Sequence, residues 1–186
     1  MHSTYNAEKA LQAFAYPLAR HPEQKANYYS VLKMLYTADR ESMQERGTLI
    51  STDTHVAFEA GPSLSKTYYC IKGQTENAKR FGEFVQHIKD REVRLLQSPS
   101  TGTLSKTELR KLDQIFDKFK DFTEAQWEDY THMFEEWKKN NPTSTPEKRT
   151  FIQLEDLIDA VGMTEHKEEI LNVIKARNEV DEVLDK

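Results

Sequence analysis

Asp39 and Glu41 are the residues whose type and spacing first suggest acid–base chemistry, because two neighbouring carboxylates can donate and accept protons. The apolar residues around them repeat at helical spacing, and residues two apart on a helix point about 200° away from each other. The pair therefore cannot share a substrate. We expect instead that Asp39 or Arg40 anchors the following loop, with Asp53 and the backbone around Gly47 as partners.

Residues that bind metals or attack substrates are scattered along the chain. Cys70, the single cysteine, has no CxxC partner and falls in the middle of a predicted helix, which is typical of an inert thiol. The GxSxG nucleophile elbow and the glycine-rich phosphate loops do not occur in the sequence. We therefore predict no catalytic residue, no metal and no cofactor. The six histidines form no HxxxH pair; they are His2, His21, His55, His87, His132 and His166.

The composition is that of a polar, folded chain. Of its 186 residues, 37% are hydrophobic and 31% charged, and the apolar residues gather in periodic runs, which predicts one compact domain. No run is long enough for a membrane span and no signal peptide is visible, and a single cysteine suits a reducing compartment, so we expect a cytoplasmic protein. The net charge is −5, with ten acidic and four basic residues in 153–186, which does not favour a nucleic-acid partner.

Helix signals dominate the first third of the chain. Asn6 is a good N-cap for a first helix, and a second helix is predicted over residues 24–46, where Gly47 ends it. A short strand over residues 56–60 alternates apolar and polar side chains, and a tight turn leads into a third helix predicted over residues 62–72.

The segment from residue 82 to residue 96 fits two structures. Its apolar residues could lie on one face of a helix, or two short arms could form a β-hairpin joined through Lys89, Asp90 and Arg91. We favour the hairpin, because prolines and glycines end the second arm sharply. The hairpin is expected to form a small sheet with the strand at residues 56–60.

Two helix starts carry the clearest local signals. Ser105 with Glu108 and Thr123 with Gln126 each match a capping box, which predicts an antiparallel helix pair joined by a tight turn. The second helix is expected to carry four aromatic residues, Trp127, Tyr130, Phe134 and Trp137.

The whole pattern predicts an α+β fold that is predominantly α-helical, with a small antiparallel β-hairpin or sheet and a C-terminal helical extension. We predict a domain over residues 1–140, an exposed connector over residues 141–152, and a C-terminal helical element of the same domain over residues 153–186.

Two pairs of adjacent tyrosines point to a contact surface. Tyr28 with Tyr29 and Tyr68 with Tyr69 cannot all face one core from a helix, so at least one tyrosine of each pair is expected to be exposed or half-exposed. Tyrosine is favoured where two proteins meet. Core packing with incidental exposure is the interpretation that we favour over a contact surface.

The order of the motifs resembles the Panacea domain, the SocA-like family of antitoxins. The motifs that carry the resemblance are EKALQAFAY at 8–16, LYTADR at 35–40, Asp53, Val56-Ala57, Gly61-Pro62, YYCIKG at 68–73, LSKTE at 104–108, Thr131-His132 before Trp137, and LEDLIDAVG at 154–162. The resemblance implies an antitoxin, bacterial or prophage-encoded, that binds and neutralises a cognate toxin from an adjacent gene and is not an enzyme. It supplies no catalytic residues. The residues we predict to contact the partner are Tyr36, Asp39, Asp53, Phe58, Gly61 and Pro62.

Two alternatives stand beside the neutralising antitoxin. The same family fold is used by adaptors that deliver a toxin to a protease, here a cytoplasmic AAA+ protease, and residues 153–186 could dock it. The other alternative is a DNA-binding autoregulator in which the hairpin forms a wing. Its basic edge would consist of Lys79, Arg80, Lys89, Arg91 and Arg94.

Overall fold

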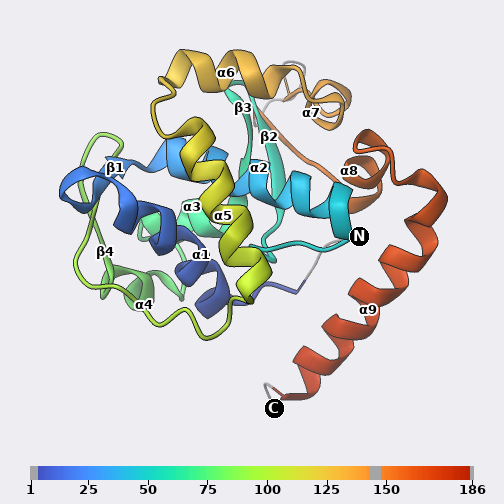
Figure 1. Ribbon diagram of the computed structural model, residues 1–186, viewed down its shortest axis with the longest axis horizontal. Coiled ribbons are helices and arrows are strands. Elements are labelled where there is room, and N and C mark those ends of the chain that lie inside the picture. Colours follow the sequence, from blue (N-terminus) through green and yellow to red (C-terminus); the bar gives the residue numbers. More distant parts are fainter. Residues whose placement is uncertain (1–3, 143–147, 185–186) are drawn as a thin grey trace.

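The computed structural model describes residues 4–142 and 148–184 and is mostly helical, with two small antiparallel sheets (Figure 1). This confirms the predicted fold class. The helices are α1 (Ala7–Arg20), α2 (Tyr28–Arg46), α3 (Ser65–Ile71), α4 (Ala78–Gly82), α5 (Lys106–Phe119), α6 (Glu124–His132), α7 (Glu135–Lys139), α8 (Leu154–Ala160) and α9 (Lys167–Leu184), with short 3-10 turns at Pro22–Gln24 and Thr164–His166. The strands are β1 (Lys25–Asn27), β2 (His55–Phe58), β3 (Gly61–Leu64), β4 (Val85–Lys89), β5 (Glu92–Leu95) and β6 (Arg149–Phe151).

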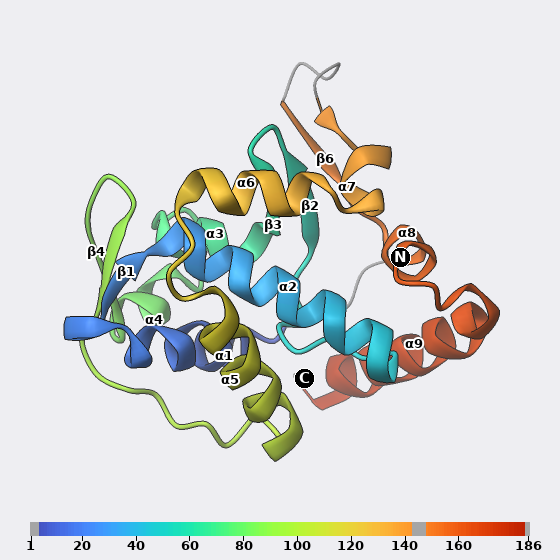
Figure 2. The same cartoon turned by 45° about the horizontal axis from the view of Figure 1, so that its top comes forward.

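Helix α2 lies at the centre of the molecule. Helices α1, α5, α6 and α8 and strand β3 all pack against it, and most of its residues are buried (Figure 2). We predicted that this helix begins at residue 24, but it begins at Tyr28. The preceding segment, Lys25–Asn27, pairs with β5, and the Asn27 side chain accepts the backbone N–H of Tyr29. Gly47 ends α2 in the left-handed conformation, as expected.

Strands β2 and β3 form a tight hairpin. The helix that we predicted from residue 62 therefore starts later than expected. Pro62 lies in β3 opposite Ala57, and α3 begins only at Ser65. Proline is tolerated in such an edge strand because the outer N–H is not needed for pairing. On the other side, β2 pairs with β6, a segment that we had placed in an exposed connector. Residues 143–147 of that connector lie outside the described residues, and the division at residues 140 and 152 stays a prediction.

The hairpin predicted around Asp90 is confirmed as β4 and β5. It does not join the strand at residues 56–60, as we expected: β5 pairs with β1, so the order of this sheet is β1-β5-β4 and the β2 strand belongs to the other sheet. The strand that pairs with β5 is β1, a short extended segment before α2 that lies far from the hairpin in sequence.

Both capping boxes at the starts of α5 and α6 are confirmed. The predicted antiparallel pairing of these helices is wrong: α6 leads away from the end of α5 at a steep angle instead of running back along it (Figures 1 and 2), and both helices pack on α2. They meet at an aromatic cluster, where the Phe119 ring lies 5.0 Å from the rings of Trp127 and of Tyr130. The expected single aromatic helix also breaks after His132, so that Trp137 lies on α7.

A second, smaller core joins the C-terminal helices to the end of α2. Met43 and Leu49 pack there against α8 and against Ile170 and Ile174 of α9. Gly47 lies under α9, and a Cβ at this position would come 2.9 Å from Ile170 Cγ1. Within the described residues, no helix is both long and apolar enough to cross a bilayer.

Candidate functional site

Asp39 anchors the loop after α2, as we predicted, although its partners differ. The carboxylate is fully buried, and its Oδ1 accepts the backbone N–H of Ile50 (2.7 Å) and of Ser51 (2.8 Å). Its Oδ2 accepts the Ser51 hydroxyl and is hydrogen-bonded to His55 Nε2 (3.1 Å). Asp53 is not among these partners, and the backbone donors lie three and four residues after Gly47. The carboxylate thus holds the start of β2 against α2.

Asp53 anchors the start of α3 in a similar way, through its side-chain carboxylate. Leu64, the residue before α3, has an apolar side chain that cannot accept a hydrogen bond from the helix. Asp53 accepts N–H groups of the first turn instead, from Lys66 (2.9 Å) and Thr67 (2.7 Å). It also accepts the Thr67 hydroxyl (2.6 Å). Burial raises the pKa of Asp53, and these hydrogen bonds oppose that shift.

Tyr36 ties α2 to α7 from inside the core. Its hydroxyl donates to Glu136 Oε1 (3.2 Å), which also accepts Arg40 Nε (3.0 Å). Burial, and then the negative charge of Glu136, raise the pKa of the Tyr36 phenol. Tyr36, Asp39 and Asp53 are each at most 1% exposed. In this structure they position other elements and present no surface to a partner.

Lys33 is the residue of this region that the sequence analysis missed. It lies on α2, is 1% exposed, and donates through Nζ to the carbonyls of Ala60 (2.8 Å) and Pro62 (2.8 Å) at the tip of the β2–β3 hairpin. Tyr29 donates to the same Ala60 carbonyl (2.6 Å). Burial lowers the pKa of the Lys33 ammonium well below its ordinary value. A lysine on the apolar face of a predicted core helix was the available signal.

Two side chains from α6 and α7 hold the other side of the same hairpin. Trp137 Nε1 donates to the Phe58 carbonyl (2.9 Å), and His132 Nε2 donates to the Glu59 carbonyl (3.0 Å). The two rings stack on each other, with centroids 3.8 Å apart. The hairpin tip is therefore fixed from both sides by side chains more than 25 residues away in sequence.

Gly61 fits this clamp because it has no side chain. Its φ is +97°, and a Cβ would meet the hydroxyl of Thr131 and would lie 2.7 Å from Lys33 Nζ. Only glycine adopts this conformation without strain. Gly61 and Pro62 are buried, so that, of the six residues predicted to contact a partner, Phe58 is the one with a partly exposed side chain.

Beside the hairpin tip lies a small pocket of about 160 Å³. Its walls combine aromatic rings with two cations and join β2, β3, α2, α3 and the β4–β5 turn. We call it the tyrosine pocket; its lining residues are Tyr28, Tyr29, Leu32, Lys33, Phe58, Ala60, Gly61, Ser63, Tyr68 and Arg91.

The tyrosine pairs behave as the sequence predicted. Tyr28 is buried, whereas Tyr29, Tyr68 and Tyr69 are half-buried, so each pair keeps a partly exposed ring. The guanidinium of Arg91 lies 5.1 Å from the centre of the Tyr29 ring, a cation–π distance. Burial raises the pKa of Tyr29 to about 12, so its hydroxyl stays protonated and continues to donate to the hairpin.

The basic edge that would support DNA binding is partly neutralised. Arg80 pairs with Glu83 (2.7 Å) and Glu8 (3.3 Å), and Arg91 pairs with Glu124. These exposed pairs offset the positive charge that a phosphate backbone would meet. The hairpin is present, but two of its five predicted cations already have acidic partners.

The other sequence candidates lie apart from the tyrosine pocket. Cys70 is buried on α3, where its sulfur contacts Thr75 Oγ1 (3.2 Å) and Tyr5 Oη (3.6 Å). In the part of the chain that the structure describes, no three His, Cys, Asp or Glu side chains are grouped to hold a metal ion.

One family model matches this chain, described as "Antitoxin SocA-like, Panacea domain", over residues 31–138. The match runs from the first turn of α2 to α7 and includes the hairpin, the Lys33, His132 and Trp137 side chains that hold it, and all six predicted partner residues. No curated protein and no solved structure matches the chain significantly. Because the matched region covers more than half of the sequence, the chain belongs to the SocA-like antitoxin family with a Panacea domain.

Proposed function

We propose that this protein is an antitoxin that neutralises a cognate toxin by direct binding, without making or breaking a covalent bond. Membership of the antitoxin family is the observation that supports this function. The proposed contact surface is the tyrosine pocket and its rim, which receives one side chain of the toxin. The buried residues Tyr36, Asp39 and Asp53 act indirectly, because they hold the elements that form the pocket.

The residue types around the tyrosine pocket support this surface. Tyrosine and arginine are among the residues that most often dominate binding energy at protein interfaces, since tyrosine offers a large, rigid ring and arginine a fork of hydrogen-bond donors. A volume of about 160 Å³ suits a single side chain of a partner rather than a cofactor. The clamp on the hairpin tip keeps Phe58 in place before the partner arrives, which lowers the cost of association.

The test is co-expression with the product of the adjacent gene. The wild-type protein should restore growth and co-purify with that product. Tyr68→Ala should weaken the complex by about 2 kcal/mol or more, roughly thirtyfold in Kd, and lose the rescue. Tyr16→Ala is the matched control, because Tyr16 is also a half-buried tyrosine but contacts Asp113 on α5, away from the pocket.

Two outcomes would contradict the proposal. If the wild-type protein neither rescues growth nor co-purifies with a toxic neighbour, direct neutralisation fails. If Tyr68→Ala and Tyr16→Ala bind equally well, the surface lies elsewhere. The same strain tests the adaptor alternative, since an adaptor shortens the half-life of the toxin whereas a neutralising antitoxin leaves it unchanged.

A further inference from the structure

A second hollow lies where α9 meets the body of the molecule, and it shares no lining residue with the tyrosine pocket. Its volume is about 470 Å³, within the range of small-molecule sites. The start of α1, the end of α2 with its following loop, the start of α5 and helix α9 all contribute to it. We call it the α9 pocket; the lining residues used below are Lys9, Arg46, Thr48, Thr52, Glu108 and Arg177.

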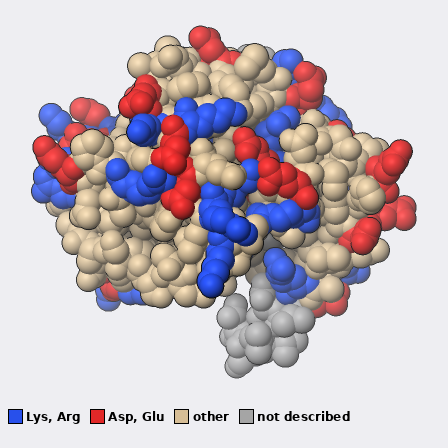
Figure 3. All heavy atoms as spheres, viewed as in Figure 1, with Lys and Arg blue, Asp and Glu red and all other residues tan. Residues whose placement is uncertain are grey.

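The α9 pocket is positively charged in an acidic protein. Lys9, Arg46 and Arg177 line it against a single carboxylate, that of Glu108, so its charged side chains sum to +2 whereas the chain carries −5. Figure 3 shows Lys and Arg side chains in the middle of this face, over α5 and toward α9, with Asp and Glu side chains beside them. Glu108 is already engaged, since it accepts Lys9 Nζ at 2.7 Å.

The two arginines keep unused donors. Arg46 donates through Nη2 to Ser42 Oγ (2.9 Å), and among the described residues its Nη1 has no hydrogen-bond partner; its Nε is buried and does not face the pocket. The side chain of Arg177 makes no hydrogen bond or ion pair with any residue that the structure describes. A guanidinium carries five N–H donors in a rigid fork. Two such groups at one pocket therefore leave several donors for a bound ligand.

Hydroxyl groups complete the lining. Thr52 Oγ1 accepts the backbone N–H of Asn6 (3.1 Å), which leaves the hydroxyl proton of Thr52 to donate. Thr48 Oγ1 lies 3.2 Å from Ser42 Oγ on the same side as Arg46. Guanidinium forks combined with hydroxyl donors match the geometry and charge of a phosphate, which offers several oxygens and two negative charges.

We propose that the α9 pocket binds a phosphate group, either as inorganic phosphate or as the monoester group of a small metabolite. Arg46 from α2 and Arg177 from α9 donate to its oxygens, and Thr52 adds a neutral donor. The bound phosphate thereby bridges α9 to the body. This site is independent of toxin binding at the tyrosine pocket.

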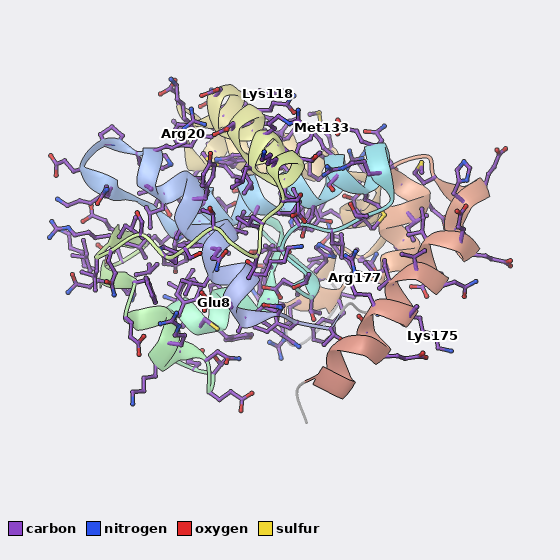
Figure 4. The ribbon with its side chains drawn as sticks, turned by 60° about the horizontal axis from the view of Figure 1, so that its bottom comes forward. Glu8, Arg20, Lys118, Met133, Lys175 and Arg177 are labelled. Carbon is purple, nitrogen blue, oxygen red and sulfur yellow. The ribbon has the colours of Figure 1, made fainter. Side chains whose placement is uncertain are left out.

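The helical register places Arg177 on the correct side of α9. Ile170, Ile174 and Arg177 recur at intervals of four and three residues, so the arginine continues the stripe that packs on the second core. Lys175 lies two residues away and therefore on the other side. Figure 4 shows this difference: Arg177 lies on the side of α9 facing the body, and Lys175 on the outer side.

The test is titration of the purified full-length protein with inorganic phosphate at constant ionic strength, followed by calorimetry. We expect saturable binding that chloride does not reproduce. Arg177→Ala should weaken it at least about tenfold, because a charge-assisted hydrogen bond is lost. Lys175→Ala removes the same charge from the same exposed helix and should leave the affinity within about twofold. Arg46→Gln should weaken binding as Arg177→Ala does.

A second arm uses adenosine 5′-monophosphate in place of inorganic phosphate. Tighter binding of the ester assigns the pocket to a metabolite, and equal binding assigns it to phosphate itself. With either ligand, amide hydrogen exchange of residues 167–179 should slow, since the ligand ties α9 down. The proposal is overturned if phosphate acts no differently from chloride, or if Arg177→Ala and Lys175→Ala lose affinity equally, because a diffuse field would then explain the effect.

Discussion

At the scale of single residues, the centre of this protein depends on charged groups that are buried but satisfied. Asp39 has four hydrogen-bond donors around it, and Lys33 has two backbone carbonyls as acceptors. Burying a charge without partners is costly, so each of these side chains holds the backbone segment that satisfies it. The residues that we expected to touch a partner are, for this reason, mostly the residues that hold the hairpin in shape.

The pH dependence of the free energy of unfolding should reveal the lowered pKa of Lys33. Because the pKa of Lys33 is lowered in the folded protein, the unfolded chain binds more protons between that lowered value and the ordinary pKa of lysine. Raising the pH through this window therefore stabilises the wild-type protein relative to Lys33→Met. Urea unfolding of both proteins from neutral pH to about pH 10 measures the difference.

At neutral pH the same substitution has a separate cost. Lys33→Met leaves the Pro62 carbonyl without its donor, and we expect a loss of about 1–3 kcal/mol. Lys25→Met, a substitution in β1 of a lysine paired with exposed Glu23, is the control and should change little. A difference between wild type and Lys33→Met that stays constant with pH would show that the folded-state pKa is not lowered.

At the scale of elements, helix α9 is attached through a narrow contact. Ile170 and Ile174 pack on the second core, Thr4 N–H donates to Asn178 Oδ1 (2.8 Å), and Gly47 allows Ile170 to approach the end of α2. Other described side chains of α9 are more open, and Val173 is 52% exposed. Elements with few buried contacts open more easily than the core, so α9 should be among the first to exchange.

Gly47→Ala should detach α9 specifically. The new Cβ is strained at φ +64° and meets Ile170 Cγ1 at 2.9 Å, so we expect a loss of about 2 kcal/mol and faster amide exchange in residues 167–179. Gly73→Ala is the control, since Gly73 also has a positive φ (+72°) but nothing lies within 4 Å of the added Cβ. It should lose only about 1 kcal/mol and leave exchange in α9 unchanged. Equal exchange in the two variants would rule out the contact as the main attachment of α9.

At the scale of the whole molecule, the chain builds two cores that share helix α2. The larger core surrounds Tyr36 and Trp127, and the smaller one joins Met43 and Leu49 to α8 and α9. The segment between α7 and α8 also contributes strand β6, which pairs with β2 of the β2–β3 hairpin. The C-terminal region is therefore in contact with the same sheet that borders the tyrosine pocket.

A chain ending at residue 140 tests whether residues 153–186 belong to the same domain. It lacks β6, α8 and α9, which exposes Met43 and Leu49 and leaves one edge of β2 unpaired. We expect the free energy of unfolding to fall by about 3 kcal/mol or more, with a smaller urea m-value because less surface is buried. A truncated chain as stable as the full one would mean that the C-terminal region is an independent unit.

Much of the secondary structure could be predicted because its causes are local. The capping boxes at Ser105 and Thr123 join residues three positions apart, and Gly47 ends α2 through its own backbone conformation. The turn at Asp90 likewise depends on its neighbours. The family could be recognised for the same reason, since ordered motifs are visible without any knowledge of contacts.

What the sequence by itself determined is therefore most of the helices, the helix ends that local caps mark (Gly47, Ser105 and Thr123), the β4–β5 hairpin and the family. Only the tertiary structure decided that Lys33 holds the hairpin tip, that β6 completes the β2 sheet, and that Arg46 and Arg177 line one pocket. These contacts join residues about 30 to 130 positions apart, and no local propensity encodes such a pairing. They form because burial of the two cores brings the segments together, and the buried polar groups must then find partners where they lie.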